Sequence, residues 1–151
     1  MKFIVPLYVI HRTPGNESPL LWEASDFCNA LMKEYNVAST SLVCYWAMSD
    51  EGRIAKMREW TELGLWIMPE PELVEAAGLK RGGKIDFWDC GLIMRTPKEQ
   101  ETLAKVALEK YEECFGRMPK VAGSFHLMPN LINLLESYGV KVAVAFCWEQ
   151  R

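Results

Sequence analysis

Residues 121–150 constrain the fold more than any other part of this chain. An apolar run at 121–127 precedes Pro129, a residue that suits the first helical turn because its missing N–H has no intrahelical partner there. Apolar residues at helical spacing then lead to Gly139, a typical helix-ending residue, and a second apolar run occupies 141–148. A strand, a helix and a strand joined this tightly predict two parallel strands with a right-handed crossover.

The same alternation runs through the rest of the chain. Apolar runs predict six strands, and helical patterns lie between most of them: 3–10, 38–47, 65–68, 85–88, 121–127 and 141–148 are the predicted strands. Alternating strands and helices are typical of an α/β protein with a parallel sheet. The length of 151 residues suits one domain with a buried core, so we expect residues 1–151 to form a single domain.

Helix boundaries are marked at several places. The pair Thr96 and Glu99 forms a capping-box pattern, which predicts a long helix starting at 97. A second helix is predicted to follow Ser49 and to end at Gly64. The first helix is predicted to open at Pro19 and to carry its apolar side chains on one face. Those side chains belong to Leu20, Ala24, Phe27, Leu31 and Tyr35.

Composition excludes several classes of function. A net charge of −3 and the lack of a basic stripe predict no nucleic-acid partner and no attraction to anionic membranes. No run reaches the roughly 18 apolar residues of a membrane span. Five separated cysteines without a C-x-x-C pair predict neither a zinc knuckle nor a disulfide framework, and they favour a reducing, cytoplasmic setting. Dinucleotide, P-loop and nucleophile-elbow motifs are also missing from the sequence.

Polar side chains cluster where the predicted strands end. Imidazole and carboxylate groups suit a divalent metal, and they could also form an acid–base pair. The predicted metal ligands are His11, Glu70 and His126, and the predicted catalytic carboxylates are Asp86, Asp89 and Glu149. The alternative is that both histidines are loop residues with ordinary hydrogen bonds. Cys90 is the one cysteine in a polar context, and a thiol paired with His126 is a further alternative.

Aromatic residues gather near the same strand ends. Flat apolar faces beside carboxylates suit sugar rings, which present both C–H faces and hydroxyl groups. The alternative is packing, because tryptophans bury large areas wherever they occur. The predicted sugar-binding residues are Tyr45, Trp46, Trp66, Trp88 and Trp148.

Two segments give the chain a resemblance to the polysaccharide deacetylase superfamily. Residues 115–119 lead through the strand at 121–125 to the helix end and glycine at 134–140, an order similar to that of the superfamily. Residues 27–35 followed by 38–43 resemble its first helix and second strand. The run 147–150 and the segment 86–89 are more similar to a divergent branch. The chain has Ile10-His11-Arg12 and 66–70 where typical members carry paired aspartates and a His-x-x-x-His.

This resemblance implies a partial or incomplete (β/α) barrel and hydrolysis of a carbohydrate amide or ester. A divalent metal, zinc or a similar ion, would polarise the carbonyl and activate water, with a carboxylate as base. The alternatives are a catalytically silent carbohydrate-binding or structural relative and a barrel fragment without activity of its own. Typical members continue further, so the N-terminal part of a longer barrel is one expectation. Self-association through the last strand is another, because an exposed edge can pair with a second chain.

Overall fold

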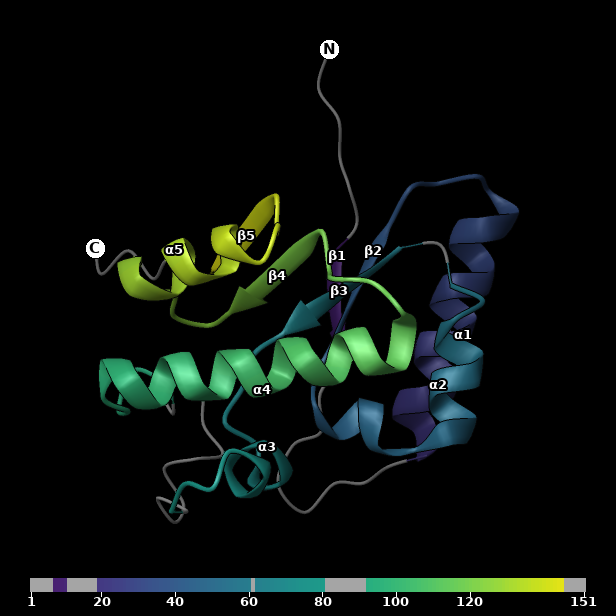
Figure 1. Cartoon of the computed structure of the whole chain (residues 1–151). Coiled ribbons are helices and arrows are strands. Elements are labelled where there is room, and N and C mark those ends of the chain that lie inside the picture. The colour runs from purple at the N-terminus through teal and green to yellow at the C-terminus, as the bar shows by residue number, and fades with distance from the viewer. Residues whose placement is uncertain (1–6, 11–18, 61, 81–91, 146–151) are drawn as a thin grey trace, which may run out of the picture.

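The computed structural model describes residues 7–10, 19–60, 62–80 and 92–145 (Figure 1). Their strands are β1 (Leu7–Ile10), β2 (Thr40–Val43), β3 (Leu63–Trp66), β4 (Val121–Ser124) and β5 (Val142–Ala145). Their helices are α1 (Pro19–Glu34), the 3-10 helix η1 (Trp46–Ser49), α2 (Glu51–Met57), α3 (Pro71–Ala76), α4 (Pro97–Phe115) and α5 (Pro129–Ser137).

The strands form one parallel sheet in the order β1-β2-β3-β4-β5. The predicted α/β class with a parallel sheet and alternating helices is therefore confirmed. Strands that are neighbours in the sequence are neighbours in space, and β1 and β5 form the two edges of an open sheet in the described part of the chain. The predicted strand at 85–88 lies outside the described residues.

The sheet buries both of its faces along β2, β3 and β4. On one face, Val43, Leu65 and Ala122 join the main core, which they share with buried residues of α4 such as Leu103 and Tyr111. Figure 1 shows α4 lying across the sheet, with α1 and α2 together at one end and α5 beside β5 at the other. The opposite face carries a smaller core of Leu42, Trp66 and Met68, with Val121 and Phe125 packed against it. This alternation is expected, because successive side chains in a strand point to opposite faces.

Two glycines on neighbouring strands make room for the large side chains of the smaller core. A Cβ on Gly64 would lie 2.5 Å from Leu42 Cδ2 and 2.6 Å from the Val121 carbonyl oxygen. A Cβ on Gly123 would lie 2.8 Å from Trp66 Cζ3. The prediction that Gly64 ends the second helix is therefore wrong, since α2 ends at Met57 and Gly64 belongs to β3. Close packing, not a left-handed turn, explains this glycine.

The predicted helix ends are confirmed for the long C-terminal helices. Thr96 Oγ1 accepts a hydrogen bond from the Glu99 N–H, and the Glu99 side chain accepts one from the Thr96 N–H, which completes the capping box of α4. Gly116 follows α4 with a φ of 68°, and Gly139 follows α5 with a φ of 85°. Both values lie in the left-handed region, where glycine carries no Cβ penalty.

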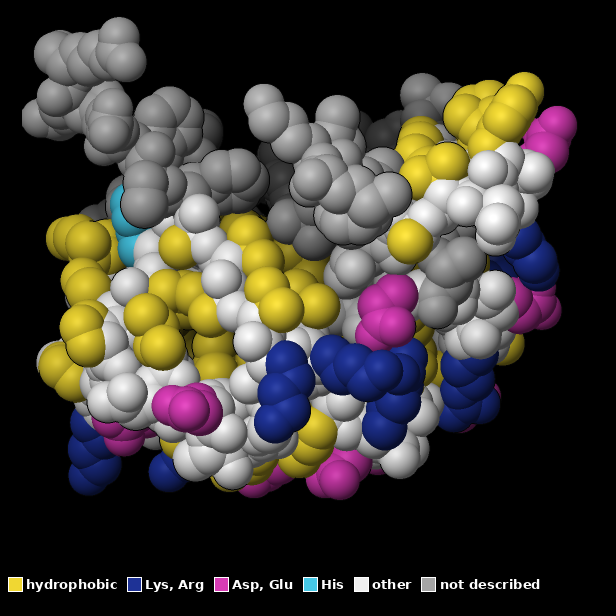
Figure 2. Space-filling model, turned by 90° about the horizontal axis from the view of Figure 1, so that it is seen from above, with side chains coloured by type: hydrophobic (Ala, Val, Ile, Leu, Met, Phe, Trp, Pro, Cys, Tyr) yellow, Lys and Arg dark blue, Asp and Glu magenta, His cyan; other side chains and the backbone are white. Residues whose placement is uncertain are grey.

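The predicted apolar face of α1 is largely exposed to solvent. Phe27 is 66% exposed and Tyr35 is 67% exposed, whereas Ser25 and Asn29 on the other side of the helix are buried. The buried amide of Asn29 is hydrogen bonded to Ser25 and Ser41, and this polar contact joins α1 to β2. Hydrophobic side chains reach the surface elsewhere too, and Figure 2 shows them gathered on one face next to a row of Lys and Arg side chains.

In the described ranges, no helix combines the length and the apolar character that crossing a membrane requires.

Candidate site at the carboxyl edge of the sheet

The carboxyl ends of β2, β3 and β4 lie side by side, because these strands are consecutive and parallel. The residues that follow them include Tyr45 and Trp46 after β2, Glu70 after β3 and His126 after β4. Catalytic residues of (β/α) folds come from this edge. The sheet thus places three parts of the predicted site along one edge.

Glu70 is a buried carboxylate that joins two of these strand ends. Glu70 is only 1% exposed. Its Oε2 accepts a hydrogen bond of 2.9 Å from the backbone N–H of Trp46. Glu70 also lies beside Cys44, whose thiol pKa is raised well above its ordinary value by burial and by the negative charge of Glu70. The carboxylate therefore fixes the start of η1 and does not face outward as an open metal ligand would.

His126 occupies a different position at the same edge. It lies two residues beyond the end of β4, is half-buried, and precedes the first turn of α5 at Pro129. Its imidazole is therefore on the loop that leads from the strand to the helix. In the part of the chain that the structure describes, no three His, Cys, Asp or Glu side chains form a group that could hold a metal ion.

The other predicted polar site residues, His11, Asp86, Asp89 and Glu149, lie outside the described residues, as does Cys90. Trp88 and Trp148 also lie outside them.

The three described aromatic residues of the predicted sugar-binding set pack in three different places. Tyr45 is half-buried, and burial raises its pKa while Lys110 of α4 opposes that rise. Trp46 is 9% exposed and packs against Trp22, with ring centroids 6.0 Å apart. Trp66 is fully buried on the smaller core, where Phe125 meets it edge-on at 5.0 Å. The structure does not bring these three rings together as one exposed platform.

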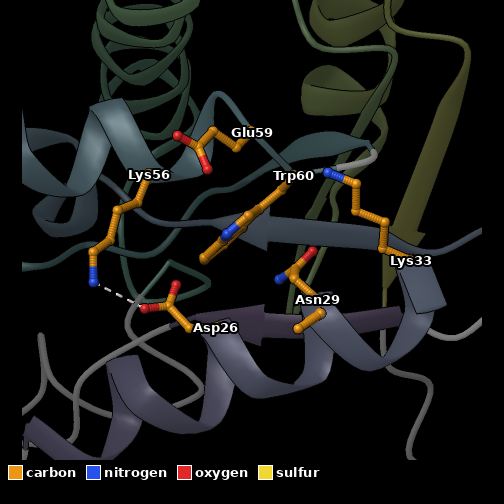
Figure 3. A pocket seen from close by; sticks show the side chains of 7 residues that line it. Asp26, Asn29, Lys33, Lys56, Glu59 and Trp60 are labelled. Atoms are coloured by element: carbon orange, nitrogen blue, oxygen red, sulfur yellow. Dashed lines mark hydrogen bonds and ion pairs between the residues drawn. The ribbon is translucent and has the colours of Figure 1, made fainter.

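The sequence reasoning missed a groove between α1 and α2. It has a volume of about 290 Å³, and its lining includes Trp60, Asp26, Glu59, Lys33 and Lys56 (Figure 3). The signal was present, because Lys56, Glu59 and Trp60 recur at three- to four-residue spacing around the end of α2. The sequence alone did not show that α1 lies beside this part of the chain.

A larger hollow of about 530 Å³ lies between α2 and α4. Its cations are already engaged. Arg58 donates two hydrogen bonds, of 2.6 and 3.1 Å, to the carbonyl oxygen of Cys114, and Lys110 pairs with Glu113 at 3.0 Å. The described residues that line this hollow include no aromatic side chain, whereas the groove contains Trp60.

No model of a known protein family and no curated protein sequence matches this chain, so its family membership stays a prediction from its motifs.

Proposed function

We propose that this chain is a carbohydrate-acting domain of the polysaccharide deacetylase type, which hydrolyses an amide or ester on a sugar. The observation that supports it is the consecutive order of the parallel strands, which aligns the residues after β2, β3 and β4 along one edge. A sheet wound in this order is the arrangement of part of a (β/α) barrel, whose chemistry lies at the carboxyl ends of the strands. The resemblance of residues 115–140 to the polysaccharide deacetylase superfamily implies the class of substrate.

His126 is the described residue best placed to act on a substrate. A histidine can take up or give a proton near neutral pH, and it is also a common metal ligand. Its position on a half-buried loop after β4 leaves it at the edge. Glu70 has a supporting role in this proposal, because its carboxylate holds the Trp46 N–H at the end of the neighbouring strand.

The proposal includes a divalent ion, zinc or a similar metal, that His11 and His126 would bind through their ring nitrogens. Such an ion would supply polarisation of the substrate carbonyl. The buried Glu70 does not fit a place among the ligands, since its residue is 1% exposed and its Oε2 already accepts the Trp46 N–H.

The test is acetate release from N-acetylated and O-acetylated sugars, measured together with the metal content of the purified protein. His126→Ala should lower acetate release by a factor of about 100, the usual loss when a proton-transferring residue is removed. Glu136→Gln is the matched control, because Glu136 is exposed on α5, the helix that follows His126. A folded protein that releases acetate equally well with and without His126 would contradict the proposal, and so would one that releases none.

A second candidate is a catalytically silent carbohydrate-binding relative. The burial of Glu70 favours it, because the sequence predicts Glu70 as a metal ligand, and a carboxylate buried against the Trp46 N–H is not open to a metal ion. Sugar binding that persists with a chelator and in His126→Ala, without acetate release, would support this candidate over the hydrolase.

A further inference from the structure

The groove between α1 and α2 carries a different kind of chemistry from the carboxyl edge. Asp26, Asn29 and Lys33 reach it from α1, Lys56 reaches it from α2, and Glu59 and Trp60 follow α2 directly. Figure 3 shows the Trp60 ring in the middle of the groove, with the Asp26–Lys56 pair on one side and Lys33 on the other. All of these residues lie on α1, on α2 or in the turn after α2, and none of them lies on a strand.

The Trp60 ring packs against the indole of Trp22. It is half-buried, and its ring centroid lies 6.3 Å from that of Trp22 at an interplanar angle of 37°. Trp22 in turn packs against Trp46, and the Arg53 guanidinium lies 5.0 Å from the Trp22 ring and 4.3 Å from the Trp46 ring. Aromatic and cation–π contacts of this kind stabilise the ring positions. The groove therefore has an indole platform that is ordered before any ligand binds, which lowers the entropy cost of binding.

Asn29, in the wall of the groove, is held by two hydrogen bonds to other protein groups. Asn29 is 5% exposed, its Nδ2 donates to the Ser25 carbonyl oxygen at 3.0 Å, and its Oδ1 accepts from Ser41 Oγ at 3.4 Å. Both ends of this amide are thus occupied by protein groups. Recognition of a ligand is left to the indole face and to the charged side chains around it.

Those charged side chains balance one another. Two carboxylates, Asp26 and Glu59, can accept hydrogen bonds, and two ammonium groups, Lys33 and Lys56, can donate them. Lys56 Nζ already pairs with Asp26 Oδ2 at 3.0 Å, and the two side chains stay 64% and 36% exposed. Exposed ion pairs contribute little to stability, so their hydrogen-bonding capacity is available to a ligand. Because the groove has no net charge, its electrostatic potential does not favour a charged ligand over a neutral one.

We propose that this groove binds one pyranose ring of a neutral carbohydrate, stacked on Trp60. The apolar C–H face of the sugar would cover the indole, and its hydroxyl groups would donate to Asp26 and Glu59 and accept from Lys33 and Lys56. The volume of about 290 Å³ lies at the small end of ligand pockets and suits a single ring. The lining of this site includes none of the residues placed at the carboxyl edge, and the proposal does not depend on hydrolysis there.

The experiment is saturation-transfer NMR on the full chain with two pyranose probes, methyl β-glucoside and N-acetylglucosamine, and with glycine betaine as a zwitterionic probe. Saturation should reach the ring C–H protons of a sugar, with a dissociation constant on the order of 1 mM for a ligand of this size. Trp60→Leu should weaken sugar binding at least about tenfold, because it removes the platform. Trp60→Phe keeps a flat ring and should weaken binding less. If Trp60→Leu does not fold, Trp60→Phe still tests the role of the ring.

Glu59→Gln and Glu23→Gln form a matched pair, because Glu59 lines the groove while Glu23 is exposed on α1 outside it. The first should weaken sugar binding and the second should leave it unchanged. Betaine binding that depends on Trp60, without sugar binding, would overturn the proposed ligand class. The proposal is also overturned if no probe binds, or if sugar binding is the same in every variant. Sugar binding in the groove should be unchanged in His126→Ala, which removes the residue proposed to act at the carboxyl edge, so failure here and failure of the hydrolase proposal are distinguishable.

Discussion

The backbone N–H of Trp46 donates a hydrogen bond of 2.9 Å to Glu70 Oε2, and this contact joins the ends of β2 and β3. Trp46 begins η1, and Glu70 directly precedes α3. One buried carboxylate thus orders two turns at the edge where the proposed chemistry lies. The same Trp46 packs on Trp22, which supports Trp60 in the groove. The edge and the groove therefore share a row of packed side chains.

Removing the Glu70 carboxylate should destabilise the protein substantially. Glu70→Ala leaves the Trp46 N–H without its acceptor in a buried place, which should lower the free energy of unfolding by about 3 kcal/mol. Glu70→Gln retains a carbonyl acceptor and should cost about 1 kcal/mol. Urea unfolding measures both values. Glu109→Ala, at an exposed position of α4, is the control and should change stability by less than about 0.5 kcal/mol. A Glu70→Ala value as small as that of the control would contradict a structural role.

Gly123 should not tolerate even a methyl group. Alanine there would place its Cβ 2.7 Å from the Val144 carbonyl oxygen and 2.8 Å from Trp66 Cζ3, so β5 or the indole must move. We expect Gly123→Ala to lower the free energy of unfolding by about 2 kcal/mol, the usual scale for overpacking. Gly52→Ala within α2 is the contrast, because alanine favours a helix by about 1 kcal/mol over glycine and its Cβ would approach only the Asp50 side chain. Thermal unfolding should show a lower midpoint for Gly123→Ala than for Gly52→Ala.

The order of elements could be predicted from the sequence because several boundaries carry a strong local signal. The capping box of Thr96 and Glu99 and the left-handed glycines at 116 and 139 act through neighbouring backbone groups, and the structure contains all of them. The burial of α1 could not be predicted in this way. Phe27 and Tyr35 form an apolar stripe at helical spacing, yet Asn29 on the other side meets Ser41 of β2. Hydrophobic periodicity marks a face but does not say which partner is present.

The candidate site shows the same division. Consecutive parallel strands were enough to predict that the residues after β3 and β4, Glu70 and His126, share one edge. The direction of the Glu70 side chain was not predictable, because it depends on a backbone N–H located 24 residues earlier. Trp60 was missed for a related reason, since its platform exists only where α1 lies beside α2. Sequence patterns located strand ends, and tertiary contacts decided the role of each side chain.

Tyr111 should make the protein lose stability in alkali. Its hydroxyl donates to the Leu63 carbonyl oxygen at 2.8 Å, and burial raises its pKa from the ordinary 10.0 to about 12. Because the folded pKa is higher than the unfolded one, this contribution is complete below pH 10 and is lost as the pH rises from 10 to 12. The loss amounts to about 3 kcal/mol. Unfolding in urea at a series of pH values measures it.

Tyr111→Phe separates this effect from the other groups that titrate in alkali. The variant lacks the hydrogen bond to Leu63 and should be about 1 kcal/mol less stable than the unmodified protein at pH 7. It also lacks the titrating phenol, so by pH 12 it should be the more stable of the two. Parallel stability curves for the two proteins from pH 9 to pH 12 would show that Tyr111 does not titrate as expected.

The open side of β5 should promote self-association. β5 pairs with β4 along Val142–Ala145, and no second strand pairs with it among the described residues. Val142 is 50% exposed, so this edge presents apolar side chains together with backbone groups that can template another strand. We expect sedimentation velocity to show concentration-dependent association that Val142→Lys abolishes, since an edge lysine opposes strand pairing. Ile132→Lys is the matched control, because Ile132 is 43% exposed but lies on α5. Association that both lysine variants abolish equally would assign it to general surface hydrophobicity, and a monomer at all concentrations would contradict the prediction.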